Sequence, residues 1–368
     1  MNIGRRVNMD TRILYINPPG DIYKGVGGIQ TYAREIQIAM RARGYEIMDI
    51  SFDPPAVLGD LSLQDYFPRA FCFNRYYFWR TNYLSDYRYH NALYHLTRKA
   101  IKEFRPDLLH IFHTYQYGAV WASNVPSIVT CHGLEITDIP PVRGSLERAA
   151  GIHCNSNFTK ARMESFLGPQ IKARVHTWGI RTTALPEIEA KYDLITVGRV
   201  VKRKNIDTIL HVLALHPELR YAVVGEGPEL PRLQELAKTL GLNNVDFFGK
   251  VSEDEKNHLL SLSRLFVMCP RNDNDSDVEG LGLVFYEAHG AGLPVLSARS
   301  GGAPEAIGEA GILVADPLDV ASVEQSLLTA LEPATYARLR AAVRQRQNTC
   351  TWERFIDGLD FWYRELLV

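Results

Sequence analysis

The chain has 368 residues, of which 46% are hydrophobic and 23% charged, and its formal net charge is −1. This length and composition are typical of a globular protein of about two domains, and they exclude a disordered, collagen-like or low-complexity chain. The balanced charge argues against a protein that coats nucleic acid. The charge is unevenly spread, because residues 1–180 carry 21 basic and 15 acidic side chains whereas residues 181–368 carry 20 and 27.

The sequence contains no apolar stretch of about 18 residues, and residues 1–10 lack the apolar core of a signal peptide. We therefore expect a cytoplasmic protein that neither spans a membrane nor is secreted. The five cysteines are widely spaced and form no Cys-x-x-Cys pair, which predicts reduced thiols and no zinc site. These are Cys72, Cys131, Cys154, Cys269 and Cys350.

The acidic run Asp273-x-Asp275-x-Asp277 does not fit a calcium loop. Val278 and Val284 stand where an EF-hand needs glycine and glutamate. We expect a solvated polar loop there and predict no metal site.

Short β-branched runs alternate with helical patterns, which is typical of parallel α/β sheets. The helical patterns cover residues 29–43 and 229–240, and each follows a glycine-rich turn and ends at a glycine, as βα units do. A last amphipathic pattern, 352–366, predicts a packing helix. The predicted strands are Ile13–Asn17, Leu108–Phe112, Ser127–Cys131, Ile152–Asn155, Leu194–Gly198, Tyr221–Gly225, Leu265–Cys269 and Pro294–Ser297.

Periodicity lapses over residues 177–191, and a new strand–turn–helix unit starts at Tyr192. We therefore expect two domains, residues 1–180 and 181–349, followed by a packing helix at 350–368. Open α/β sheets bind ligands at the carboxyl ends of their strands. If the strand ends of the two domains face each other, a ligand is expected in the cleft between them.

The strongest local pattern is Glu279-Gly-Leu-Gly-Leu-Val-Phe-Tyr-Glu287, which follows a strand and a polar loop. If a helix begins near Gly282, the amides of Gly280, Leu281, Gly282 and Leu283 lie at its N-terminus, where anions are favoured. Glu287 would then lie inside the helix with its carboxylate available to a diol. The alternative is an ordinary N-terminal acid and a solvated glutamate.

A basic turn, Arg199 to Lys204, follows the first strand of the second half. Arginine offers a planar fork to phosphate and lysine a point charge, so Arg199 and Lys204 are candidates for binding a diphosphate. Lys202 and Arg203 are interpreted as solvated side chains.

Two weaker candidates lie in the first half. The loop with Gly27 and Gly28 opens a helix and could bring backbone amides against a phosphate or sugar, although it is neither a dinucleotide fingerprint nor a P-loop. His132 directly follows an apolar strand, where it could face a ligand or be a buried structural histidine.

In this order and at these distances the motifs resemble the GT-B family 4 glycosyltransferases, which are retaining and use nucleotide sugars. The resemblance is dense in residues 193–317, which include Val197-Gly-Arg199, Val223-Val-Gly-Glu-Gly-Pro228, Val245-Asp-Phe-Phe-Gly-Lys-Val251, Glu279-x7-Glu287 and Ser300-Gly-Gly-Ala-Pro-Glu305. It is thinner in residues 15–32 and 126–160 and absent from 51–105. It implies an α/β fold of two Rossmann-like, doubly wound parallel-sheet domains that face each other across a cleft, with the C-terminal helix packed on the first.

The resemblance also implies roles for the candidate residues. Glu287 would hold the ribose hydroxyls, Glu279 the donor sugar, and Arg199 and Lys204 the diphosphate. His132 would lie beside the anomeric carbon. The remaining contacts would come from backbone: Val251 at the base, Gly280, Leu281, Gly282 and Leu283 at the sugar and phosphate, and Gly27 and Gly28 at the phosphate.

The implied enzyme is a retaining hexosyltransferase in bacterial glycoconjugate or polysaccharide synthesis that needs no metal or other cofactor. Fixed Arg, Lys and helix-end donors would neutralise the leaving diphosphate in place of a metal ion. The segment Asp277-Val-Glu-Gly-Leu-Gly-Leu-Val284 looks most like the branch that uses GDP-mannose, with UDP-sugars as the alternative. The acceptor would be a glycan, a lipid-linked hydroxyl or a small molecule. A nucleotide-sugar epimerase of the same architecture and a non-catalytic sugar-nucleotide-binding subunit are the rival interpretations.

Residues 66–94 hold twelve aromatic side chains, and residues 69–105 hold eight basic against two acidic ones. Basic charge with Trp and Tyr favours an anionic lipid interface, which predicts peripheral contact with the inner face of the membrane. An aromatic subdomain packed on the core, with its arginines reaching water, and sugar stacking are the alternatives.

Overall fold

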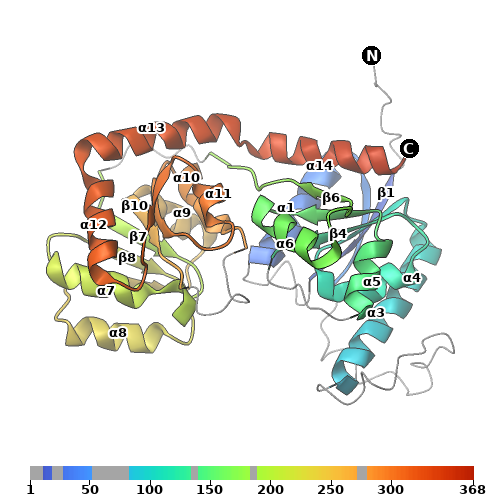
Figure 1. Ribbon diagram of the computed structural model, residues 1–368, viewed down its shortest axis with the longest axis horizontal. Coiled ribbons are helices and arrows are strands. Elements are labelled where there is room, and N and C mark those ends of the chain that lie inside the picture. Colours follow the sequence, from blue (N-terminus) through green and yellow to red (C-terminus); the bar gives the residue numbers. More distant parts are fainter. Residues whose placement is uncertain (1–10, 19–27, 52–82, 134–139, 183–188, 272–279) are drawn as a thin grey trace. The chain divides into compact units, whose positions relative to one another are not determined.

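The computed structural model describes residues 11–18, 28–51, 83–133, 140–182, 189–271 and 280–368 (Figure 1). The chain divides into two compact units. Unit 1 comprises residues 1–155, 159–176 and 356–368, and unit 2 comprises residues 156–158 and 177–355. The division in the chain therefore falls after His176, four residues before the expected boundary.

Unit 1 is a six-stranded parallel sheet in the order β2-β1-β3-β4-β5-β6, with helices packed around it. Its strands are β1 (Arg12–Ile16), β2 (Glu46–Ile50), β3 (Leu108–Ile111), β4 (Ser127–Cys131), β5 (Gly151–Cys154) and β6 (Ala173–Val175). Its helices are α1 (Gly28–Ala42), α3 (Tyr83–Phe104), the 3₁₀ turn η3 (Thr114–Gln116), α4 (Tyr117–Ala122), α5 (Pro140–Arg148) and α6 (Asn157–Leu167). The central strands are fully buried because helices cover both faces of a parallel sheet.

Unit 2 is a second six-stranded parallel sheet, in the order β12-β11-β10-β7-β8-β9. Its strands are β7 (Tyr192–Val197), β8 (Tyr221–Val224), β9 (Val245–Gly249), β10 (Ser263–Met268), β11 (Val295–Ala298) and β12 (Gly311–Val314). Its helices are η4 (Lys202–Lys204), α7 (Ile206–Leu215), α8 (Leu230–Thr239), α9 (Glu253–Ser261), α10 (Leu283–Gly290), α11 (Ala303–Ile307), α12 (Val320–Leu331) and α13 (Pro333–Thr349). The prediction of two parallel α/β sheets is confirmed.

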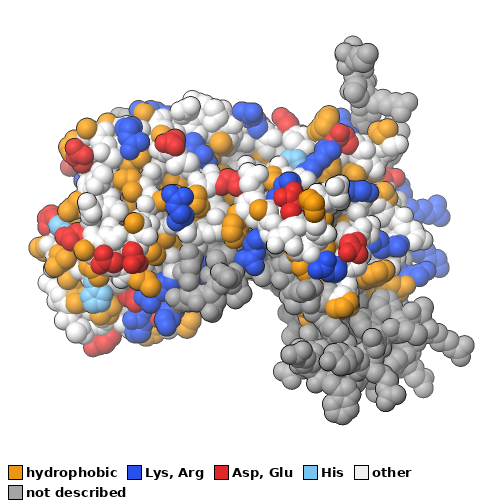
Figure 2. Space-filling model, in the orientation of Figure 1, with side chains coloured by type: hydrophobic (Ala, Val, Ile, Leu, Met, Phe, Trp, Pro, Cys, Tyr) orange, Lys and Arg blue, Asp and Glu red, His pale blue; other side chains and the backbone are white. Residues whose placement is uncertain are grey.

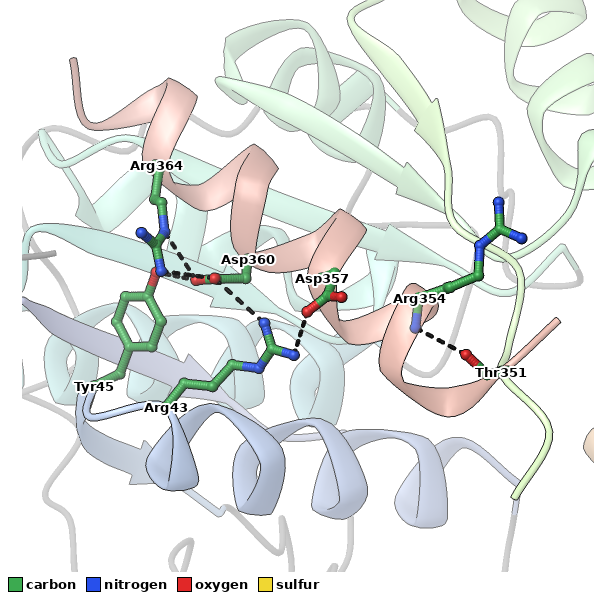
Figure 3. Close-up of polar contacts among 7 residues, drawn as sticks. All are labelled: Arg43, Tyr45, Thr351, Arg354, Asp357, Asp360 and Arg364. Carbon is green, nitrogen blue, oxygen red and sulfur yellow. Dashed lines mark hydrogen bonds and ion pairs between the residues drawn. The ribbon is translucent and has the colours of Figure 1, made fainter. Parts of the chain in front are cut away.

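The last helix, α14 (Trp352–Leu366), starts in unit 2, and residues from Ile356 onward belong to unit 1. Its polar anchor on unit 1 is the Asp360 carboxylate, which accepts hydrogen bonds from Tyr45 at 2.5 Å, Arg364 at 2.8 Å and Arg43 at 3.3 Å (Figure 3). Arg43 also pairs with Asp357 one turn earlier. Residues of the turn between α1 and β2 thus hold this helix.

A buried chain of hydrogen bonds connects α14 with α1 through the sheet of unit 1. The Tyr363 hydroxyl bonds Nδ1 of His110, and Nε2 of His110 lies 2.6 Å from the Thr130 hydroxyl. Thr130 lies 3.2 Å from Nδ1 of His153, whose Nε2 is 3.4 Å from the Tyr32 hydroxyl. Burial lowers the pKa of His110 to about 3 and that of His153 well below its usual value, so both rings stay neutral. Each ring can therefore donate at one nitrogen and accept at the other.

In the described part of the chain, no helix is long and apolar enough to cross a membrane. Lys and Arg side chains are interspersed with Asp and Glu over the face seen in Figure 2. Cys131, Cys154 and Cys269 are buried free thiols, and Cys350 is a half-buried one. Burial raises the pKa of Cys154 and of Cys269 to about 12, so both thiols stay protonated at neutral pH.

Unit 2 contains a pH-dependent contact between α7 and α12. Nε2 of His216 lies 2.7 Å from Glu324, and Nδ1 lies 3.1 Å from Glu218. The hydrogen bond to Glu324 raises the pKa of His216 against partial burial, with a further contribution from Glu218. The stabilisation is then fully present below the unfolded pKa of about 6.5 and is lost as the pH rises through the raised folded pKa.

We therefore expect Glu324→Gln to lower the free energy of unfolding more at about pH 5.5 than at about pH 8.5. Urea titrations of both proteins at the two pH values measure the difference. Glu235→Gln, which removes an exposed charge on α8, is the matched control and should cost the same at both pH values. A Glu324→Gln effect that grows with pH would contradict the assignment.

Candidate functional site

The sheet of unit 2 has a topological switch point between β7 and β10, which are neighbours although they are the first and fourth strands of the unit. Connections leave these two strands toward opposite sides, so ligands of open α/β sheets bind beyond their carboxyl ends. The loops that follow β7 and β10 therefore border a candidate site. They contain the basic turn and the glycine-rich turn that the sequence singled out.

The loop after β7 carries both basic candidates. Arg199 is exposed and makes no ion pair with any residue that the structure describes, whereas Lys204 is half-buried at the end of η4. Asn205 follows with φ 57°, a left-handed conformation that few residues other than glycine adopt. The structure thus brings Arg199 and Lys204 onto one short, tightly turned loop.

Arg271, which the sequence analysis missed, holds this loop. Its guanidinium donates to Oδ1 of Asn205 at 2.7 Å and to Asp207 at 2.5 Å, and its amide donates to the carbonyl of Arg203 at 2.8 Å. Burial opposes the charge on Asp207, but Arg271 outweighs it and the net pKa of this carboxyl is lowered. A cation just after β10 therefore fixes the turn that begins α7. No local sequence signal separates it from an ordinary surface arginine.

Glycines bring the loops of this edge into backbone contact. A Cβ on Gly227, in the loop after β8, would lie 2.0 Å from the carbonyl oxygen of Val200, and one on Gly302 would lie 2.2 Å from that of Gly280. Such distances are far below van der Waals contact, so only glycine fits. Gly280 and the loop of Arg199 are therefore each positioned by a neighbouring glycine loop.

The glycine-rich turn ends as expected. Gly282 is the N-cap of α10 with φ 76° and ψ 69°, and Gly280, Leu281 and Gly282 are buried while Leu283 is half-buried. The first amides of a helix have no acceptor within the helix, so those that open α10 can bind an anion. Glu287 lies in the second turn of α10 and is half-buried.

The Glu287 carboxylate is held by a second residue that the sequence analysis missed. Nζ of Lys256 on α9 lies 2.9 Å from Oε2 of Glu287, and Lys256 also pairs with Glu253. Burial works against the charge on Lys256, but the two carboxylates outweigh it and raise its pKa. Val251 is half-buried after β9, just before Ser252 caps α9. The segment 251–256 therefore has Val251 at one end and, at the other, Lys256 in its ion pair with Glu287.

In unit 1, His132 directly follows β4, as predicted, and is buried. Its Nε2 donates to the carbonyl of Phe112 at 3.0 Å, and its ring packs perpendicular to that of Tyr32 with centroids 5.2 Å apart. Burial and a backbone hydrogen bond are the features expected of a structural histidine, and its position at a strand end is also what a ligand contact requires. Gly28 is the exposed first residue of α1.

Several predicted features lie outside the described residues: Gly27, Glu279, the run Asp273–Asp277 and most of the aromatic stretch, 66–82. The aromatic stretch defined above runs to residue 94, and its Tyr89 is described and is buried in the core of unit 1. Among the residues that are described, no three His, Cys, Asp or Glu side chains form a group that could hold a metal ion.

The contact between Gly302 and Gly280 makes a testable prediction. Gly302→Ala should lower the free energy of unfolding by roughly 1–3 kcal/mol, because its Cβ would force the turn before α10 to move. Gly241→Ala is the control, since nothing lies within 4 Å of its Cβ and only its φ of 71° is strained. Denaturant titration compares them, and a smaller loss for Gly302→Ala than for Gly241→Ala would contradict the close packing.

Two family models match the chain side by side. Residues 26–183 match "Glycosyltransferase Family 4", and residues 183–346 match "Glycosyl transferases group 1". The two models together account for most of both units. The chain therefore belongs to the family 4 glycosyltransferases of GT-B fold.

A curated relative is the GDP-mannose-dependent alpha-(1-6)-phosphatidylinositol monomannoside mannosyltransferase of Mycobacterium tuberculosis, which is 32% identical over 208 residues. That match covers 49% of this chain and 53% of the relative, so the chain spans about half the length of the curated relatives it matches. Two solved structures share the fold over nearly the whole chain. Sucrose-phosphate synthase of Thermosynechococcus elongatus has a TM-score of 0.74 at 20% identity, covering 97% of this chain and 99% of that one. The Anabaena protein HepE with UDP-glucose has a TM-score of 0.69 at 16% identity, covering 96% and 99%.

Proposed function

We propose that this protein is a retaining glycosyltransferase that moves a hexosyl unit from a nucleoside diphosphate sugar to the hydroxyl of a glycan, lipid-linked or small-molecule acceptor. The observation that carries the proposal is the set of groups at the switch point of unit 2. Arg199 and Lys204 follow β7, the N-terminal amides of α10 follow β10, and the Glu287 carboxylate lies one turn further along α10. Cations and helix-end amides suit a diphosphate, and a carboxylate suits the ribose diol.

GDP-mannose is the proposed donor, with UDP-sugars as the alternative. The name of the mycobacterial relative and the form of the segment 277–284 support mannose and guanine. The backbone beside Val251 is proposed to contact the base, and Glu287 the ribose. His132 and Glu279 are proposed to contact the donor sugar, and the amides of Gly27 and Gly28 its phosphate.

The proposed reaction replaces one bond at the anomeric carbon with another on the same face. The acceptor oxygen bonds to the anomeric carbon as the bond from that carbon to the diphosphate breaks, and the leaving phosphate oxygen takes the acceptor's proton. Negative charge grows on the leaving group, so Arg199, Lys204 and the amides of α10 stabilise the transition state more than the ground state. In this proposal these fixed donors neutralise the charge on the leaving diphosphate, and no metal ion is required.

Thermal unfolding with GDP, UDP and ADP, each with and without magnesium, tests the donor site. A ligand that binds only the folded protein raises its unfolding temperature by mass action. We expect GDP to raise it most, magnesium to add little, and Glu287→Ala to lose the shift. A magnesium-dependent shift would overturn the metal-free mechanism, and no shift with any nucleotide would overturn the donor site. Nucleotide-sugar turnover without an acceptor that yields an epimer would favour the epimerase.

We also propose that the basic part of α3 contacts an anionic membrane that carries the acceptor. Arg98, Lys99 and Lys102 on α3, and Arg105 just beyond it, are exposed, and Glu103 is the one acidic residue within 98–105. Each basic side chain near such a surface contributes about 1 kcal/mol. Flotation with phosphatidylserine vesicles should carry the wild-type protein upward and leave the Arg98→Glu, Lys102→Glu variant behind. Equal flotation of both would contradict this contact.

A further inference from the structure

Lys256 occupies an unusual position for a lysine. Its side chain is 11% exposed, and it lies on α9 between two carboxylates, Glu253 on its own helix and Glu287 on α10. Removing an ammonium group from water is costly unless it is paired, so a buried lysine needs both partners. Glu253 is 72% exposed and on the same helix, which makes Glu287 the partner that ties α9 to another element.

The ion pair with Lys256 engages only one of the two carboxylate oxygens of Glu287. Lys256 contacts Oε2, while Oε1 has no hydrogen-bond partner among the residues that the structure describes. A carboxylate on a flexible side chain would otherwise sample several rotamers, and ordering it on binding would cost free energy. Fixing one oxygen in advance keeps the other oriented for a ligand.

We propose that Lys256 is a positioning residue of the donor site, which holds Glu287 in the orientation that accepts hydrogen bonds from the ribose diol. The inference rests on the proposed function, because it assumes that Glu287 binds ribose. It adds a residue on a different helix, α9, five positions before the last residue of that helix and five after Val251. The same lysine thereby fixes the segment proposed to contact the base relative to the carboxylate proposed to contact the sugar.

The experiment removes the ribose hydroxyl as well as the side chain. Calorimetric titration measures the affinities of GDP and 2′-deoxy-GDP, and of UDP and 2′-deoxy-UDP, for the wild type, Glu287→Gln and Lys256→Met. A hydrogen bond to a charged group is worth enough that the wild type should prefer the ribonucleotide by about tenfold or more. We expect both variants to lose most of that preference while the affinity for the deoxynucleotide changes little. Lys238→Met removes an exposed lysine of a surface pair and is the matched control, with the preference unchanged.

The outcomes separate the two proposals. If Glu287→Gln keeps the wild-type preference, the ribose assignment fails and the role of Lys256 fails with it. If Glu287→Gln loses the preference and Lys256→Met keeps it, or weakens both nucleotides equally, Lys256 only supports the fold and the positioning role is overturned. Should Lys256→Met not fold, Lys256→Gln retains one donor to Glu287, and the same comparison applies with partial loss expected.

Discussion

Replacing Arg199 with alanine is expected to slow sugar transfer about a hundred- to a thousand-fold, which is the usual effect of removing one fixed donor from a developing negative charge. Arg199 is exposed at the end of β7 and has no ion-pair partner among the described residues, so its guanidinium is available to a diphosphate. The lost interaction is made with the leaving group, whose charge increases as the bond breaks. The rate should therefore fall more than the affinity for the intact donor.

The measurement is the initial rate of GDP release from GDP-mannose with acceptor present. Arg199→Lys keeps the charge but not the planar fork, and an intermediate rate is expected. Lys202→Ala, three residues along the same loop, removes an exposed lysine that we interpret as solvated, and it should retain nearly the wild-type rate. If Arg199→Ala is no slower than Lys202→Ala, Arg199 does not act on the leaving group.

All eight strands predicted from the sequence are present, with ends within two residues of those expected. The four that were not predicted are β2, β6, β9 and β12, which are the edge strands of the two sheets. A central strand of a parallel sheet is buried on both faces and must be a continuous apolar run, as in Ile128 and Val129 of β4. An edge strand is only half-buried, as in β2 and β9, so polar residues interrupt its pattern and hide it.

The candidate site divides in a similar way. The glycines and the ends of the strands could be predicted, because Gly282 caps α10 where the sequence placed the start of a helix. Lys256 and Arg271 could not. Lys256 follows three acidic residues and looks like an ordinary solvated position, and its pairing with Glu287 depends on how α9 and α10 pack. The hydrogen bond from Arg271 to Asn205 forms only because β7 and β10 are neighbours in the sheet.

The largest effect on stability is expected from Asp360→Ala. The Asp360 side chain is 10% exposed and accepts hydrogen bonds from Tyr45, Arg43 and Arg364 (Figure 3). Removing it leaves the buried Tyr45 hydroxyl and two arginines without their acceptor. Breaking a buried pair costs roughly 3–5 kcal/mol, and about 3 kcal/mol is expected here because both arginines are partly in contact with water.

Asp357→Ala is the matched control, since Asp357 also pairs with Arg43 on the same helix but is 67% exposed. Exposed pairs contribute about 1 kcal/mol or less, so this variant should unfold close to the wild type in urea. Equal losses for the two variants would contradict the role of Asp360 as the anchor.

Hydrogen exchange of the Asp360→Ala variant measures which part of the chain is destabilised. Residues 356–368 belong to unit 1, whereas the first turn of α14 belongs to unit 2. There the Thr351 hydroxyl accepts a hydrogen bond from the backbone amide of Arg354 (Figure 3). Without Asp360 the amides from Ile356 onward should exchange faster, because local opening now costs less than before. The amides of α13 should keep their protection, since that helix packs on α10 and α12 of unit 2. Faster exchange in α13 as well would mean that Asp360 stabilises the whole chain and not the attachment of α14 to unit 1.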